Sequence, residues 1–328
     1  MAVHNDKILE KGRTCIVKTA LKNPKDFSYG KETLLMLSVP SVMAFYYFGP
    51  RVIRLLLFAV VTAYAVSIAG SFLIKCKSSP LSPNIAVTAV CVTLMMSASA
   101  SYSALGVAVL FAIAVAALPF GNGERLPFVP AAAGVAFITL CRGETMFLYP
   151  SLSSQAFANT DAHFVAGTSL AALLSEGNSI FADAFSVSEA VSGAYTGAMG
   201  ATCALAIIGT SVYLLFRQPR RFLMFISYVL SAGVFAAFFP RILTGSVLSV
   251  IMELSSGMLL FSGLFLLCAP QSSPRGTLSS VLYGITAGIL VMILRAFGIF
   301  EDSSAFAVLI MNAFVPLFSK LDKGGAVS

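Results

Sequence analysis

The residues that could carry chemistry are few, and most of them lie in one polar stretch. Residues 161–173 read DAHFVAGTSLAAL, with an aspartate, a histidine and two hydroxyl side chains beside Gly167. Small polar residues before a run of helix formers ordinarily cap the helix. Taken alone, the stretch predicts a short capped helix, with Thr168 as a cap or turn residue.

Two ionisable residues are candidates for a charge at membrane depth: Glu253 within an apolar segment and Arg295 at the end of another. A charge at membrane depth is by default a functional hypothesis, such as part of an ion path. Glu253 is close to the start of its apolar segment, so a position at the membrane interface is an equally good interpretation.

Two glycine-rich stretches precede apolar segments. One runs from Phe120 to Gly134 and the other, GAMGAT, from Gly197 to Thr202. Small residues allow close helix packing, and a helix N-terminus can also bind an anionic group. Composition favours packing over a ligand site at both positions.

Several classes of function lack the residues that they need. The six cysteines are isolated from one another and there are only two histidines, so the chain by itself predicts no zinc or iron–sulfur site. There is no phosphate-binding Walker loop, no plausible Ser–His–Asp set and no basic, aromatic-rich patch for nucleic acid.

The elements that hold these residues are predicted from composition. Of the 328 residues, 58% are hydrophobic and 11% are charged, and the mean hydropathy is +0.89. Soluble domains carry about 25% charged residues. The sequence therefore predicts an all-α polytopic membrane protein with about ten transmembrane helices. The expected spans are residues 33–49, 53–74, 83–99, 102–119, 128–142, 197–216, 221–239, 246–268, 277–294 and 304–319.

The distribution of basic residues predicts the orientation. With ten spans, sixteen of the 21 Lys and Arg residues fall on the side of the termini and five on the other. Positive residues favour the cytoplasm, so both termini are expected there. The segments are then a basic cytoplasmic tail (1–32), a five-span half (33–142), an extracytoplasmic loop (143–196), a second five-span half (197–319) and a cytoplasmic tail (320–328). An odd number of spans per half is what two inverted repeats require.

An ordered set of motifs resembles the RnfD/NqrB family of membrane subunits, and its RnfD branch in particular. FGIFED at 297–302 followed by AFAVLIMNA at 305–313 looks like that family's last hairpin and helix. The stretches 120–134 and 197–206 and the SSP at 272–274 resemble further family segments, in the same order along the chain.

The resemblance implies a flavin in the loop. Members of the family carry FMN joined through its phosphate to a threonine, attached by a separate flavin transferase. The matching residue here is Thr168, between Gly167 and Ser169 and before LAAL at 170–173. A second triplet, Ser192-Gly193-Ala194, is the competing position. The resemblance also raises the question of a second, noncovalent riboflavin.

This chain departs from the family pattern at several polar positions. Val165, Val129, Ala201 and Ala269 occupy places where the family has small-polar or polar residues. Because of these departures two interpretations stay open, a divergent flavoprotein and a flavin-free scaffold.

Three functions follow as expectations. The first is a subunit of a redox-driven ion translocase, not catalytic alone, which relays electrons coupled to Na⁺ or H⁺ transport in the bacterial cytoplasmic membrane. Its partners would be the other membrane subunits of an Rnf-type complex, including a second flavoprotein subunit, together with the flavin transferase and membrane lipid. The second is a flavin-free structural subunit of such a complex. The third is a small-solute channel, because the family resembles urea transporters in architecture.

Overall fold

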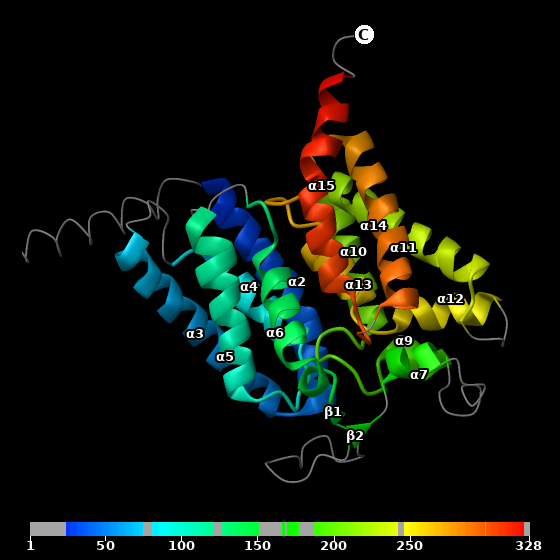
Figure 1. Ribbon diagram of the computed structural model, residues 1–328, viewed down its shortest axis with the longest axis horizontal. Helices are drawn as coiled ribbons and strands as arrows, with labels where there is room; N and C mark the ends of the chain where they lie inside the picture. Colours follow the sequence, from blue (N-terminus) through cyan, green and yellow to red (C-terminus); the bar gives the residue numbers. More distant parts are fainter. Residues whose placement is uncertain are drawn as a thin grey trace, which may run out of the picture.

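The computed structural model describes residues 24–74, 81–120, 126–150, 166–167, 169–176, 187–241, 246–298 and 300–324. Helices dominate these ranges, and the strands within them are β1 (Tyr149–Pro150) and β2 (Ala166–Gly167), which pair antiparallel. The chain is thus an all-α protein, as the composition predicts. Figure 1 shows two groups of helices side by side, with β1, β2 and two short helices at the end of the molecule away from the C-terminus.

The N-terminal half contains α2 (Pro24–Phe48), α3 (Arg51–Ile74), α4 (Pro83–Leu94), α5 (Tyr102–Phe111) and α6 (Pro130–Met146). Helix α5 continues as a π-helical segment (Ala112–Ala117) and a 3-10 turn (Leu118–Phe120). Local sequence starts these helices: the Ser82 hydroxyl accepts from Asn84 N at 3.3 Å, and Pro83 occupies the first turn of α4. Proline has no backbone N–H, and it fits there because an N–H in the first turn would have no partner inside the helix.

The short helices α7 (Leu170–Glu176) and α9 (Val187–Ser192) connect the halves. The C-terminal half contains α10 (Ala204–Arg217), α11 (Pro219–Phe238), α12 (Ser246–Ser255), α13 (Leu259–Phe261) with a π-helical segment (Ser262–Leu267), α14 (Thr277–Phe297) and α15 (Ser304–Gly324). Helices α11 and α14 pack most extensively. Gly284 and Gly288, four residues apart on α14, lie against the α11 backbone, which is the close approach that small residues permit in membranes.

The two halves use the same order of helix pairing. In the first, α3 contacts α2, α4 and α5, and α5 contacts α6; in the second, α11 contacts α10, α12 and α14, and α14 contacts α15. Across the halves α2 meets α10 and α6 meets α15. These pairs therefore recur in the same order in both halves, and the division into two five-span halves stays a prediction.

The expected count of ten spans is not confirmed. Among the described residues, five helices are long and apolar enough to cross a membrane, and a sixth span results if α12 and the α13 segment, bent by 66°, count as one. Three more apolar helices, α4, α10 and the first part of α6, are shorter. A 12-residue helix such as α4 rises only about 18 Å, less than a bilayer core.

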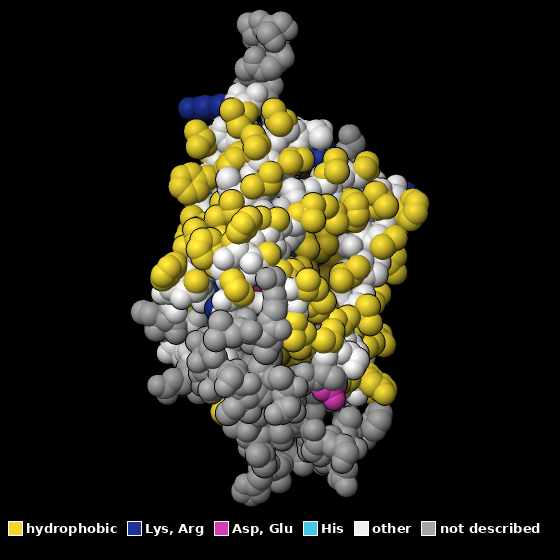
Figure 2. Space-filling model, turned by 90° about the vertical axis from the view of Figure 1, so that its right-hand side faces the viewer, with side chains coloured by type: hydrophobic (Ala, Val, Ile, Leu, Met, Phe, Trp, Pro, Cys, Tyr) yellow, Lys and Arg dark blue, Asp and Glu magenta, His cyan; other side chains and the backbone are white. Residues whose placement is uncertain are grey.

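The outer surface of the bundle is apolar. Leu230 and Phe238 of α11, Phe297 of α14 and Leu317 of α15 are all more than half exposed. Figure 2 shows hydrophobic side chains spread over a broad face with few charged groups among them. Water would not stabilise such a face, whereas lipid does, so the protein is a polytopic membrane protein.

Irregular backbone inside the helix bundle is covered by protein. The segments after α4 and before α10 cross, and Met199 N donates to Met96 O at 3.1 Å while Gly200 N donates to Leu94 O at 2.8 Å. A Cβ at Gly200 would lie 2.6 Å from the Cβ of Leu94. The glycine-rich stretch 197–202 therefore serves close packing, which is the interpretation that its composition favours.

Candidate functional site

The loop that the sequence singles out is anchored on both sides of position 168. Gly167 belongs to β2 and pairs with Tyr149 of β1. Ser169 is only 4% exposed, and its hydroxyl donates to a Glu301 carboxylate oxygen. Thr168 itself lies outside the described residues. Residues 166–167 and Ser169 are therefore held at one end of the bundle, here called the loop end, beside the α14–α15 connection (Figure 1).

The cap of α7 is Ser169. Ala172 N donates to the Ser169 hydroxyl at 3.0 Å, and Leu173 N donates to Ser169 O at 3.1 Å. The sequence taken alone assigned the cap or turn role to Thr168. A side-chain oxygen reaches the second or third N–H beyond it, so the start of α7 at Leu170 selects Ser169.

Helices α7 and α9 pack against α12 through a small apolar cluster. Leu170, Leu174, Ala190, Tyr195 and Met252 are all buried there. The Tyr195 hydroxyl donates to Ser255 O at 2.5 Å, at the C-terminal end of α12. Helices α7 and α9 are thus packed against the second half, and Ser169 and Tyr195 are tied to it by hydrogen bonds.

Glu301 and Asp302 are adjacent carboxyls with opposite properties. Burial raises the pKa of Glu301 to about 7, the Ser169 hydrogen bond opposes that shift, and the Asp302 charge adds to it. For Asp302, burial alone would raise the pKa, but the Arg295 charge and the hydrogen bonds at Ser304 and from Met258 N outweigh it and lower the pKa. At neutral pH Asp302 is ionised, whereas Glu301 is close to half protonated.

Asp302 belongs to a buried charge cluster together with Arg241, Glu253 and Arg295. Arg241 binds Glu253 with two hydrogen bonds of 2.5 and 2.7 Å. Arg295 donates to Asp302 Oδ2 at 2.8 Å and lies 3.8 Å from Glu253 Oε2. The side chains of Glu253, Arg295 and Asp302 are at most 2% exposed. Two positive and two negative charges are therefore compensated away from water.

Glu253, for which the sequence leaves an ion path and an interfacial position open, belongs to this cluster. Its carboxylate is buried and paired. Arg295, the other candidate, belongs to the same cluster and also donates to Ser256 O at 3.0 Å. Sequence reasoning missed Arg241 and Asp302. The available signal was opposite charges at the ends of neighbouring apolar segments.

The break between α12 and α13 is built around the cluster. Gly257 has a φ of +59°, and a Cβ there would strike Asp302 Oδ2 and lie 2.7 Å from Arg295 Nη2. Met258 N donates to Asp302 Oδ2 at 2.6 Å. Only glycine both adopts this backbone conformation readily and leaves space for the carboxylate and the guanidinium.

The competing triplet, Ser192-Gly193-Ala194, forms the end of α9. Gly193 has a φ of +92°, and a Cβ there would lie 2.7 Å from the Cys203 Cα. The Ser192 carbonyl accepts from the Tyr47 hydroxyl at 3.0 Å. The glycine thus ends a helix against the start of α10, which is a structural explanation for this triplet.

Comparison with known protein families gives a match over most of the chain. The family model described as "NQR2, RnfD, RnfE family" matches residues 23–324. The chain belongs to this family. The structural features above are thus those of a member of the NQR2, RnfD, RnfE family.

Among individual relatives, the D-type subunit of the Na(+)-translocating ferredoxin:NAD(+) oxidoreductase complex of Acetobacterium woodii is 23% identical over 294 residues, which covers 89% of this chain and 88% of that protein. The D-type subunit of the ion-translocating oxidoreductase complex of Stutzerimonas stutzeri is 31% identical over 141 residues, 42% of this chain and 39% of the relative. The Klebsiella pneumoniae protein of the same name is 32% identical over 113 residues, 34% and 32% respectively. The last two matches therefore span well under half of the relatives' own length.

The structure explains why some of the family-like motifs occur together. In the amide orientation that satisfies its neighbours, Asn312 accepts from Val129 N at 3.0 Å and donates to Ser272 O and the Tyr283 hydroxyl at 3.2 Å each. Ser272 Oγ donates to Leu126 O at 2.9 Å. One asparagine on α15 thus joins the start of α6, the segment before α14 and α14 itself.

Three of the departures from the family pattern are buried, and the fourth, Val165, lies outside the described residues. Val129, Ala201 and Ala269 are 6%, 3% and 6% exposed. Apolar side chains at these places contribute to the core and offer no polar group to a ligand inside the bundle. Within the described ranges, no three His, Cys, Asp or Glu residues lie close enough to hold a metal ion.

Proposed function

We propose that this chain is the D-type membrane subunit of a bacterial ion-translocating oxidoreductase complex and that it carries FMN as a phosphoester of Thr168. The family match over residues 23–324 carries the proposal. The names of the relatives supply the class of complex. In this role the chain relays electrons coupled to Na⁺ or H⁺ movement and is not catalytic alone.

The residues around position 168 fit an attached phosphoester. Gly167 has no Cβ that would crowd the attachment, and the neighbouring hydroxyl of Ser169 is buried and engaged with Glu301 and Ala172 N. Ser169 therefore does not compete with Thr168 as the acceptor. Glu301, the carboxyl that accepts from Ser169, has its pKa raised by burial to about 7, which reduces its repulsion of an added negative phosphate.

The chain would supply position, attachment and proton exchange. FMN, when bound, supplies one- and two-electron transfer through its ring. The β1–β2 pair, the Ser169–Glu301 hydrogen bond and the docking of α7 on α12 hold the segment that flanks the attachment point. Glu301 can take up or release a proton near neutral pH at an oxygen that contacts Ser169.

The proposed location is the bacterial cytoplasmic membrane, with both termini cytoplasmic and the loop end outside. The Lys and Arg distribution supports this orientation. The proposed partners are the other membrane subunits of an Rnf-type complex, including a second flavoprotein subunit that exchanges electrons with this one. A flavin transferase would attach the FMN.

The test is co-expression with a flavin transferase followed by in-gel flavin fluorescence of the denatured band and intact mass measurement. Wild type is expected to fluoresce and to gain the mass of one flavin mononucleotide unit, located by digestion to the peptide that contains residue 168. Thr168→Ala should abolish both signals. Thr168→Ser, which keeps a hydroxyl, and Ser192→Ala, which removes the competing one, should retain them.

A wild-type chain without covalent flavin, or a signal unchanged by Thr168→Ala, would contradict the flavin proposal. The second candidate function is then a flavin-free structural subunit of the same complex. The apolar side chains at Val129, Ala201 and Ala269 favour that alternative. Co-purification of the partner subunits without flavin on this chain would support it.

A further inference from the structure

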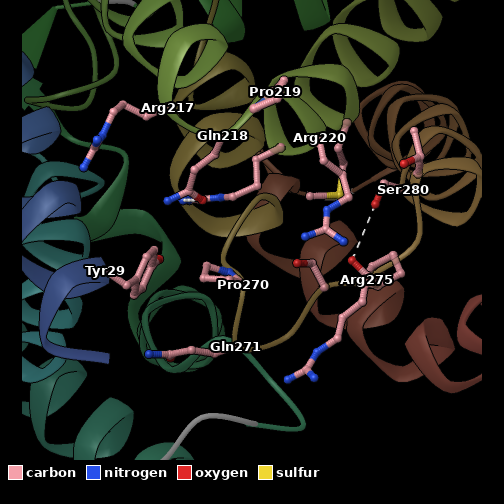
Figure 3. Close-up of a pocket in the computed structure, with 14 residues that line it drawn as sticks. Tyr29, Arg217, Gln218, Pro219, Arg220, Pro270, Gln271, Arg275 and Ser280 are labelled. Atoms are coloured by element: carbon pink, nitrogen blue, oxygen red, sulfur yellow. Dashed lines mark hydrogen bonds between the residues drawn. The ribbon is translucent and has the colours of Figure 1, made fainter. Parts of the chain in front are cut away.

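The end of the bundle opposite the loop end holds a cleft lined by arginines. A cavity of about 890 Å³ is bounded by the α10–α11 corner, the start of α14, Tyr29 of α2 and the segment 270–275. Arg217, Arg220, Arg221 and Arg275 all line it, and together they are called the arginine cleft. Figure 3 shows Arg217 and Arg220 on one side of the opening and Arg275 on the other.

Two of the four arginines are already engaged within the chain. Arg217 donates to Glu32 at 2.7 Å. Arg221 is 8% exposed, donates to Cys268 O at 2.6 Å and to Gln218 Oε1 at 2.8 Å, and lies over the Tyr29 ring. These contacts fix one wall of the cleft and leave its charge in place.

The other two arginines have no ion-pair partner in the described part of the chain. Arg220 and Arg275 are both exposed. The acidic residue that pairs with a cleft arginine among the described residues is Glu32, so four guanidinium groups face one compensating carboxylate. The first turns of α11 and α14 also start at the cleft, and their dipoles add positive potential.

The depth of the cleft points to the membrane interface. Arg220 is the second residue of α11, and Arg275 lies two residues before α14; both helices are candidate membrane spans. Three residues further into each span, Leu223 and Leu278 are 43% and 67% exposed. Both Arg220 and Arg275 are therefore followed, three residues later, by an exposed apolar side chain available to an acyl chain.

We propose that the arginine cleft binds the phosphate group of an anionic phospholipid, with Arg220 and Arg275 as its ligands and Leu223 and Leu278 against the acyl chains. Guanidinium groups match phosphate oxygens in geometry, and basic pockets between spans on the positive side of a membrane recognise anionic headgroups. This site lies at the opposite end of the bundle from Gly167 and Ser169, so it does not depend on the flavin proposal.

The test measures thermal unfolding of the purified full-length chain in detergent with added phosphatidylglycerol, phosphatidylcholine or inorganic phosphate. Phosphatidylglycerol should raise the Tm, and the other two should not. Arg220→Ala with Arg275→Ala should raise the half-saturating concentration of phosphatidylglycerol by about tenfold or more. The control Lys320→Ala removes an exposed charge near the C-terminal end of α15, on the same side, and should leave the response unchanged.

A second measurement keeps the proposal open to refutation if the double alanine variant does not fold. Photoactivatable phosphatidylglycerol should label peptides that contain residues 217–223 or 275–282 in wild type, and Arg220→Lys with Arg275→Lys should keep that labelling. An equal Tm shift with inorganic phosphate would overturn the lipid assignment in favour of a soluble anion. An equal shift with phosphatidylcholine, a shift retained in the double alanine variant, or a response lost in Lys320→Ala would overturn the site.

Discussion

Charge is arranged differently at the two ends of the bundle. At the loop end, Arg241 and Arg295 lie against Glu253 and Asp302, and three of these four side chains are almost fully buried. At the arginine cleft, Arg217 is 58% exposed. A charge that leaves water must be compensated within the chain, whereas an exposed charge stays available to a ligand. Burial, and not the number of charges, separates a structural cluster from a candidate binding surface.

The largest expected effect comes from breaking the buried charge cluster. Asp302→Asn leaves the buried Arg295 without its closest carboxylate and weakens the acceptor of Met258 N. We expect the free energy of unfolding to fall by about 3–5 kcal/mol. Chemical unfolding of the detergent-solubilised chain measures it. The double variant Arg295→Met with Asp302→Leu removes both charges and should recover part of the loss; an Asp302→Asn chain as stable as wild type would contradict the assigned compensation.

A smaller effect on stability is expected at Glu301, next to the ion-paired Asp302. Burial raises the pKa of Glu301 from 4.5 to about 7. Its protonated form is favoured in the folded state, so its contribution to stability is full below about pH 4.5 and is lost as pH rises through about 7. Glu301→Gln should therefore be more stable than wild type at pH 8, by about 1–2 kcal/mol, and close to wild type at pH 5. Unfolding at a series of pH values measures this difference, and identical pH dependence in both chains would refute it.

The smallest effect is expected at the arginine cleft. Arg217→Ala removes an ion pair whose arginine is largely exposed, and solvent screens such pairs. We expect no measurable change in Tm, in contrast to Asp302→Asn at the other end. Differential scanning of both variants under the same conditions makes the comparison direct. A loss at Arg217 as large as that at Asp302 would remove the distinction between the two ends.

Sequence reasoning located the loop but not what holds it. Gly167, Thr168 and Ser169 were selected by resemblance, and the structure adds that Ser169 caps α7 and binds Glu301. These two residues are 132 positions apart. No local pattern reports a contact of that separation, because it depends on where the α14–α15 connection lies relative to the loop.

The same limit applies to the charged residues. Glu253 and Arg295 were visible as ionisable groups in apolar segments, yet their partners Arg241 and Asp302 lie in connections outside those segments. The bend at Gly257 brings α12 and α14 together at this point. The arginine cleft was not predicted from the sequence, because its basic residues were interpreted only as indicators of membrane orientation.

The sequence by itself determined that the chain lies in a membrane, that its polar loop separates two helical halves, and which family it resembles. These properties depend on local hydropathy and on motif order, and both can be read along the chain. The tertiary structure decided that the charges at the loop end are paired and that Arg220 and Arg275 are exposed beside a shared cavity. The crossings and breaks of the helices set the distances between these charged side chains. The crossings in turn depend on how side chains from distant segments pack together.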